Sequence, residues 1–569
     1  MKFKILYQKG SSSFKEEKSN IETLTINEEI NEEVNEEINS MNRDIWIFLD
    51  KISRSIKNYW LQLRIDKNKN KVSIENNEDL YKSNLYKLVS DQEINILIEK
   101  TNQVYNKLLF ECNLQDNQNY LMKMTIHQNS KVAFFGDYHS SLHSLAECLL
   151  DLKNNDFFIS EDSWILKDNN YIVFTGDLVD RGPYGIECLY LVYQLFILNN
   201  SNTSKVIILN GNHEEVNVYD NYGFRLELEN QINPYTKEKF ESLIKRLPLA
   251  LFLKYGEETK WYQFCHGAID EEIQLSDFFN EFLNNDDNIL VIPEEFNGLG
   301  FLWNDITNDN INDLIHDIFP ENLEINIFDD INLINEEEAI NEFKYFLERE
   351  RKDIHFNYFN NISYLKNLIK LKFLKKNVKL ENFIKEILKK KNRARNVIFK
   401  DILQYVLENN NIKLLISGHQ DFANLGLVIK DEFLDENYIS NYIDHEDYKK
   451  SYEINTFSHL VTYESHLKTI EGLNNNSNDM SSDNTTINLN LNTNELLGIV
   501  TSSAVIPRNV PFSIYGILNS QNITMNYFKS CTTHTWINKN YNNRNPIALC
   551  NDEDEIKGYD LIQNNLLLL

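Results

Sequence analysis

The sequence predicts an α/β protein in which short buried strands alternate with helices. Five short runs, rich in β-branched and aromatic residues, each stop abruptly beside Gly, His or Asp. These runs are residues 131–135, 171–175, 206–210, 261–265 and 413–417. Continuous apolar runs of this length are typical of strands buried on both faces. Polar residues therefore collect at the carboxyl ends of strands, where α/β sheets bind ligands.

Two amphipathic stretches lie between these runs, at residues 142–152 and 186–198, and their apolar spacing predicts helices. His143 falls in the first stretch, and we expect it on the surface of that helix. Alternating strands and helices place the chain in the α/β class rather than in an all-helical or all-strand class.

The chain has 569 residues, which is too long for one ordinary core and predicts about two to four structural units. Its formal net charge of −29 disfavours a general nucleic-acid binder, because a phosphate backbone would be repelled. An anionic substrate must then be attracted by local positive charge, which bound cations would supply.

The six cysteines form no Cys-x-x-Cys pair, which indicates free thiols in a reducing compartment rather than a disulfide framework. No apolar run is long enough to span a bilayer, and the first residues lack the basic-then-apolar pattern of a signal peptide. We therefore expect a soluble, cytosolic protein.

Changes in composition predict the domain organisation. Residues 1–125 form a helical, acidic extension, in which apolar residues four apart between Ile26 and Asn39 predict a one-sided helix. A solvated acidic arm is the alternative there, and residues 44–109 have the spacing of a helical accessory region. The remaining units are a first core part (126–305), a helical hairpin insertion (306–392), a second core part (393–532) and a tail (533–569).

Two segments have biased compositions. Residues 366–395 are strongly basic and could dock a partner or an anionic membrane surface, with a solvated helix face as the alternative. Residues 474–494 are rich in Asn, Ser and Thr and predict a flexible loop.

The strand ends carry the motifs Gly-Asp-Tyr-His, Gly-Asp-Leu-Val-Asp-Arg-Gly, Gly-Asn-His-Glu, His-Gly and Gly-His. They supply two carboxylates, three imidazoles and one amide, from Asp137, His139, Asp177, Asn212, His266 and His419. This set of nitrogen and oxygen donors without thiolate suits a pair of divalent ions such as Mn, Fe or Zn. One carboxylate must bridge the two ions, and Asp177 is the candidate.

These motifs resemble the phosphoprotein phosphatase family of metallophosphoesterases over residues 130–305 and, more weakly, 393–505. The resemblance implies a calcineurin-like β-sandwich flanked by helices. It also implies two divalent metal ions, Mn first with Fe or Zn as alternatives, and hydrolysis of phosphomonoesters on proteins by a hydroxide that the two ions hold.

The resemblance also implies roles for individual residues. One metal takes Asp137, His139 and Asp177, and the other takes Asp177, Asn212, His266 and His419. His213 is the general acid and Asp180 orients it, while Arg181, Arg393 and Asn212 contact the substrate phosphate, with Arg395 as the alternative to Arg393.

The sequence departs from the family at several positions. Ser140 and Ala268 replace glycines, and residues 503–507 keep only the start of a Ser-Ala-Pro-Asn-Tyr loop. The preference between phosphoserine or phosphothreonine and phosphotyrosine therefore stays open. The insertion after Trp303-Asn304-Asp305 and the divergent end resemble the secreted effector phosphatases of Legionella, which would place the protein in a host cell's cytoplasm.

Two other functions remain as alternatives. The first is a nucleotide phosphoesterase, either a dinucleotide polyphosphate hydrolase or a nuclease, and the order of Gly-Asp-Leu-Val-Asp-Arg-Gly and Gly-Asn-His-Glu favours the phosphatase branch over the nucleases. The second is a non-catalytic interaction scaffold for the insertion, which the intact set of ligands disfavours.

Overall fold

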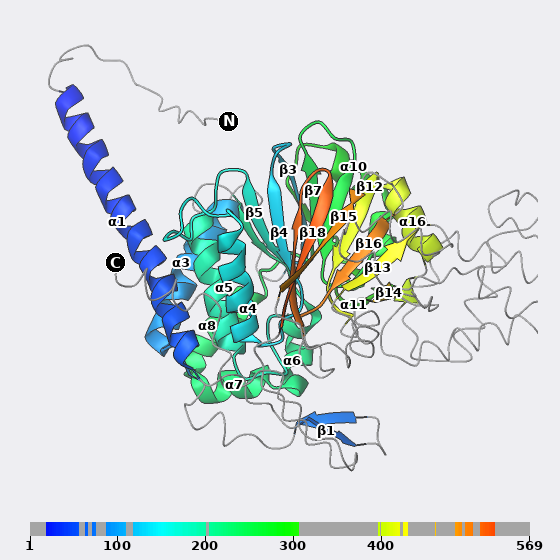
Figure 1. Ribbon diagram of the computed structural model, residues 1–569, viewed down its shortest axis with the longest axis horizontal. Coiled ribbons are helices and arrows are strands. Elements are labelled where there is room, and N and C mark those ends of the chain that lie inside the picture. The colour runs from blue at the N-terminus through cyan, green and yellow to red at the C-terminus, as the bar shows by residue number, and fades with distance from the viewer. Residues whose placement is uncertain are drawn as a thin grey trace, which may run out of the picture.

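Two β-sheets face each other at the centre of the protein, with helices on their outer faces (Figure 1). The computed structural model describes residues 19–55, 63–66, 71–74, 87–109, 118–200, 204–306, 397–398, 400–420, 425–430, 461–462, 484–491, 496–503 and 512–529. The predicted α/β sandwich flanked by helices is confirmed.

The first sheet has six strands in the order β15-β18-β17-β4-β5-β6. The bounds are β15 (Asn484–Asn490), β18 (Asn522–Lys529), β17 (Phe512–Leu518), β4 (Lys131–Phe135), β5 (Asn170–Phe174) and β6 (Val206–Ile208). Strands β4, β5 and β6 are parallel, so their carboxyl ends lie at one edge of the sheet. Because β15 lies within residues 474–494, the prediction of a flexible loop is wrong for that part. Its Asn-rich composition hid a seven-residue pairing with β18.

The second sheet has eight strands in the order β14-β13-β16-β12-β8-β7-β3-β9. The bounds are β14 (Val461–Thr462), β13 (Leu425–Ile429), β16 (Leu496–Thr501), β12 (Ile412–Ser417), β8 (Trp261–Cys265), β7 (Ala250–Tyr255), β3 (Tyr120–Ile126) and β9 (Ile289–Val291). Strand β12 pairs in parallel with both β8 and β16, which brings the ends of β8 and β12 side by side. Strand β3 spans the boundary expected between residues 125 and 126.

The core between the sheets is closely packed. Phe134 of β4 and Phe264 of β8 are fully buried and meet edge to face, with 6.2 Å between ring centroids. Val173, Leu251 and Ile416 belong to the same cluster. This packing fixes one sheet against the other and therefore fixes the distance between their strand ends.

Helices cover the outer face of the six-stranded sheet. Helices α4 (Leu142–Asn154) and α5 (Gly185–Asn199) pack on the strands, and α1 (Ser19–Arg54), α3 (Asp91–Leu109), α7 (Phe224–Gln231) and α8 (Pro234–Ile244) pack outside them, against α4, α5 or one another. Helices α4 and α5 match the two predicted helices. The stretch from Ile26 to Asn39 lies within α1, so it is helical rather than an arm without secondary structure.

The carboxyl half of α1 packs into the core. Trp46 is fully buried, 5.2 Å from Trp164 between ring centroids, and its indole Nε1 donates to the carbonyl of Asp162 at 2.7 Å. The N-terminal region therefore shares one hydrophobic core with α4 and α5.

A strand pair, β1 (Leu63–Asp66) and β2 (Lys71–Ile74), lies within the region expected to be helical. This part of the helical prediction is wrong. Four residues in each strand are too few for their alternation to stand out from the helical spacing around them. The pair is drawn below the sheets in Figure 1.

The outer face of the other sheet carries α9 (Glu271–Gln274), α10 (Asp277–Asn284), α11 (Gly300–Trp303) and α16 (Lys400–Asn409). Strand β10 (Asp305–Ile306) pairs in parallel with β11 (Val397–Ile398) and joins the two ends of the insertion. The insertion between them, its basic segment and the tail lie outside the described residues. Within the described part of the chain, every helix is too short or too polar for a membrane span.

Candidate metal centre

The structure brings the predicted ligands together at the facing edges of the two sheets. Asp137 and His139 follow β4, Asp177 follows β5, and Asn212 begins the short helix η2 (Asn212–Glu214) after β6. His266 follows β8 and His419 follows β12 in the other sheet. All six side chains are buried.

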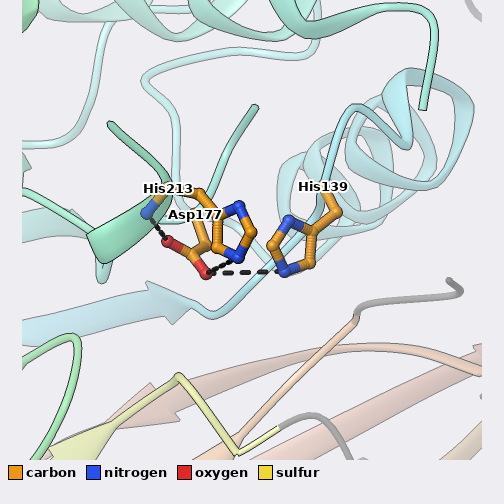
Figure 2. Close-up of side chains that lie close together, drawn as sticks. All are labelled: His139, Asp177 and His213. Carbon is orange, nitrogen blue, oxygen red and sulfur yellow. Dashed lines mark hydrogen bonds and ion pairs between the residues drawn. The ribbon is translucent and has the colours of Figure 1, made fainter. Parts of the chain in front are cut away.

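Asp177 lies between two groups of ligand atoms. Its Oδ2 is 3.4 Å from His139 Nε2 and 3.2 Å from His266 Nε2. Figure 2 shows the carboxylate reaching toward the imidazoles of His139 and His213. The ligand atoms of His139, Asp177 and His213 lie within 4.8 Å of one another, as do those of Asp137, Asp177 and His266. Asp177 therefore belongs to both groups of candidate ligand atoms.

Asn212 completes the second group. Its Oδ1 lies 2.8 Å from His266 Nε2 and 3.0 Å from His419 Nδ1. The same two imidazole nitrogens are only 3.1 Å apart. Asp137 Oδ1 accepts the backbone N–H of His419 at 3.1 Å, which ties the first sheet to the second.

The tautomers of the three histidines fit a metal site. His139 Nδ1 lies 3.0 Å from the carbonyl of Val179, His266 Nδ1 lies 3.1 Å from that of Thr175, and His419 Nε2 lies 3.1 Å from that of Trp303. Because a carbonyl only accepts, each of these nitrogens carries the hydrogen, and the opposite nitrogen turns its lone pair inward. Histidines that bind metals in proteins are oriented in this way. The buried His and Asp groups can therefore hold divalent metal ions.

The electrostatics of the site favour positive charge. Burial lowers the pKa of His266, but Asp177 and Asp137 outweigh this effect and raise it to about 9. Burial raises the pKa of Asp177, but His266 and His213 outweigh it and hold that pKa well below its usual range. A cation between these groups would take the place of the proton that His266 otherwise binds.

The turn before Asp177 is strained. Asp177 has φ of 52°, and Gly176 before it has φ of 95°. Left-handed conformations of residues other than glycine are uncommon and persist where the surroundings hold them. A Cβ on Gly211 would collide with Asp177, so only glycine allows this close approach.

Glu214 holds the same turn, although no role was assigned to it from the sequence. Its carboxylate accepts the backbone N–H groups of Asp177 at 2.8 Å, Leu178 at 2.9 Å and Gly211 at 2.9 Å. Burial, with the nearby Asp177 charge, raises the pKa of Glu214 to about 7. Its place as the last letter of Gly-Asn-His-Glu was the only signal in the sequence.

His213 contacts the carboxyl group of Asp180 through Nδ1 and the guanidinium group of Arg181 through Nε2. Its Nδ1 lies 2.6 Å from Asp180 Oδ2, and Asp180 Oδ1 accepts the backbone N–H of Phe224 at 2.9 Å. Its Nε2 accepts from Arg181 Nη2 at 3.1 Å and lies 4.0 Å from Asp177 Oδ2. Burial raises the pKa of Asp180 well above its usual value, and the Phe224 N–H and the Arg181 charge oppose this effect.

Arg393, His143 and Ser140 are three other positions that the sequence analysis singled out. Arg393 lies outside the described residues. His143 is only 1% exposed, so the prediction of a surface position is wrong: α1 covers α4 there, and Ser55 Oγ lies 2.9 Å from His143 Nε2. Ser140 has φ of 61°, a conformation that suits the glycine it replaces.

Comparisons with known proteins agree with this geometry. A family model described as calcineurin-like phosphoesterase matches residues 130–421. Shewanella-like protein phosphatase 1 of Plasmodium berghei is 29% identical over 159 residues, which are 28% of this chain and 41% of that relative. The chain thus matches about two fifths of the length of this curated relative.

Two solved structures are also similar to the chain. A protein serine/threonine phosphatase from Saccharomyces cerevisiae has 16% identity and a TM-score of 0.34, with 59% of this chain and 74% of that chain covered. A cold-active protein-tyrosine phosphatase of a psychrophilic Shewanella has 15% identity and a TM-score of 0.25, with 56% and 73% covered.

Proposed function

Because the chain belongs to the calcineurin-like phosphoesterase family, we propose that it is a metal-dependent protein phosphatase that hydrolyses phosphomonoesters on phosphorylated proteins. One observation carries this proposal. Asp177 is buried between two groups of ligand atoms, His213 lies beside it, and Arg181 contacts His213.

In this proposal two divalent ions occupy the centre. Asp137, His139 and Asp177 would hold one ion, and Asp177, Asn212, His266 and His419 would hold the other. When bound, such ions supply an activated water and neutralise the charge of the phosphoryl group. Manganese is the first candidate, with iron or zinc as alternatives, since the donors are nitrogen and oxygen without thiolate.

The side chains around the ions bind the phosphoryl group and move a proton. Arg181 leaves His213 Nε2 and donates to two phosphoryl oxygens, as guanidinium groups do with phosphate. His213 Nε2 then takes up a proton from solvent and donates it to the leaving oxygen, while Asp180 keeps the ring oriented. Asn212 and Arg393, the latter from the sequence alone, are further contacts of the phosphate.

The substrate class is a phosphorylated protein, bearing phosphoserine, phosphothreonine or phosphotyrosine. The name of the Plasmodium berghei relative supports a protein substrate. The test is turnover of a panel of phosphopeptides with each phosphorylated residue, beside a dinucleotide polyphosphate. Hydrolysis of at least one phosphopeptide is expected, and hydrolysis of the dinucleotide alone would refute the proposal.

The cellular location of the protein and its binding partners are a further part of the proposal. The described cysteines, Cys148, Cys188 and Cys265, are buried free thiols, which supports a reducing cytosol, either of the producing cell or of a host cell that receives an effector. The basic segment at residues 366–395 would dock a protein partner or an anionic membrane surface. Co-sedimentation of the full chain with anionic vesicles tests the membrane version, and absence of binding removes it.

A further inference from the structure

The segment that enters the insertion lies directly against one predicted metal ligand. Trp303 contacts His419 and Ile306 contacts Gln420, two residues that follow β12, and Ile306 pairs in parallel with Ile398, where the chain returns from the insertion. Ile306 and Ile398 are 2% and 0% exposed, so both ends of the insertion are anchored in the core.

The side chain of Gln420 makes two hydrogen bonds to the backbone of Ile306, as a neighbouring strand would. Its Oε1 accepts the backbone N–H of Ile306 at 2.9 Å, and its Nε2 donates to the carbonyl of the same residue at 2.9 Å. Gln420 is 3% exposed, so water does not compete effectively for these two bonds. Both polar groups of its side chain are used on one residue.

The contact between Gln420 and Ile306 is connected to the metal centre through His419. His419 precedes Gln420 in the chain, and its Nε2 donates to the carbonyl of Trp303 at 3.1 Å. That bond directs His419 Nδ1 toward Asn212 Oδ1, 3.0 Å away. His419 also has φ of 69°, a conformation that needs support from its surroundings.

We propose that Gln420 is a positioning residue for His419, and that it links the ends of the insertion to one of the two metal sites. Gln420 fixes Ile306, the segment from Trp303 to Ile306 fixes the Trp303 carbonyl, and this carbonyl sets the orientation of the imidazole. A shift of the insertion's ends would reach the metal site through the same bonds. The inference rests on the proposed metal centre.

The test replaces Gln420 by methionine, which has a similar volume and makes neither bond. The apo protein is prepared by chelation, and Mn²⁺ is titrated into it by calorimetry. Loss of a group that orients a metal ligand lowers affinity about 10-fold to 100-fold. We expect this loss at one site, while the affinity of the site with Asp137 and His139 changes less than about twofold.

Two further variants complete the experiment. Gln420→Glu keeps an acceptor for the Ile306 N–H but turns a buried carboxylate oxygen toward the Ile306 carbonyl, so weaker binding at the same site is expected. Gln128→Met changes an exposed glutamine whose Nε2 donates to Glu258 Oε1 at 3.1 Å, and it should bind metal as the wild type does. Thermal unfolding of each apo protein establishes that it is folded.

The outcomes separate the two proposals. Wild-type protein that binds none of Mn²⁺, Fe²⁺ and Zn²⁺ would refute the proposed function itself. If both sites of Gln420→Met bind Mn²⁺ with the wild-type affinities, the positioning role of Gln420 is overturned and the proposed function is not. Equal weakening of both sites, or unfolding of both Gln420 variants, would make Gln420 a general structural residue and would also overturn it.

Discussion

Replacement of Asp180 by asparagine tests how the proposed acid is held. The carboxylate of Asp180 meets His213 Nδ1 at 2.6 Å, and the two side chains are 0% and 2% exposed. The variant keeps the shape and an acceptor for the Phe224 N–H, but it presents either a neutral oxygen or an N–H to the imidazole. The protonated form of His213 therefore loses its charged partner.

The expected magnitude follows from this single contact. A hydrogen bond to a charged group contributes about 1.5–3 kcal/mol to stability, and about 1.4 kcal/mol corresponds to a factor of ten in rate. Because burial prevents water from replacing the carboxylate, we expect the upper part of the range, a decrease in kcat of about 100-fold. His213→Ala, which removes the acid altogether, should lower kcat by about 10²-fold to 10⁴-fold.

The assay compares two substrates with the same metal-loaded protein. A phosphoserine peptide has a poor leaving group that needs a proton, whereas an aryl phosphate has a good one that needs it far less. The 100-fold decrease should appear with the peptide and shrink several-fold with the aryl phosphate. Asp220→Asn, at a surface carboxylate 2.8 Å from Arg225, is the control and should leave kcat unchanged.

A decrease in kcat by the same factor with both substrates would refute the role of Asp180 in proton transfer. A drop in the metal content of the Asp180→Asn protein would also refute it, because Asp180 would then support the ligands rather than the proton transfer. Metal analysis of each purified variant distinguishes these cases.

Four other predictions concern the stability of the fold and the metal centre. Trp46→Ala should lower the free energy of unfolding by about 3–5 kcal/mol in one cooperative urea transition; a separate early transition would show that α1 unfolds independently. Glu214→Gln places an amide against backbone N–H groups and should weaken Mn²⁺ binding about 10-fold to 100-fold in calorimetry, and unchanged affinity would contradict the role of the turn. Burial lowers the pKa of Lys153 to about 7, so above pH 7 only the unfolded chain keeps this proton. Wild-type stability should then rise relative to Lys153→Met by up to about 1.4 kcal/mol per pH unit between pH 7 and 10, and parallel urea curves across that range would contradict it. Removal of metal with a chelator should abolish phosphatase activity and lower the Tm, with recovery of both on adding Mn²⁺; activity that survives in metal-free protein would exclude the proposed centre.

Much of the fold follows from local sequence patterns. Strands β4 and β8 have the bounds that the apolar runs predict, and α4 and α5 cover the expected amphipathic stretches. A strand buried on both faces must be apolar at every position, so a single stretch of chain is enough to identify it. The short pair β1–β2 and the Asn-rich β15 lack such a run, and their partners decide their structure.

The candidate ligands were also visible in the sequence, because a glycine beside Asp or His at a strand end marks a sharp turn with an inward ligand. The sequence alone determined which residue types are available, from Asp137 to His419, and so the class of metal they suit. Only the tertiary structure placed Asp177 between two groups, buried His143 under α1, and set Glu214 and Gln420 behind the ligands. These contacts join residues far apart in the chain, and their energy depends on the packing of one sheet against the other, which a local pattern does not contain.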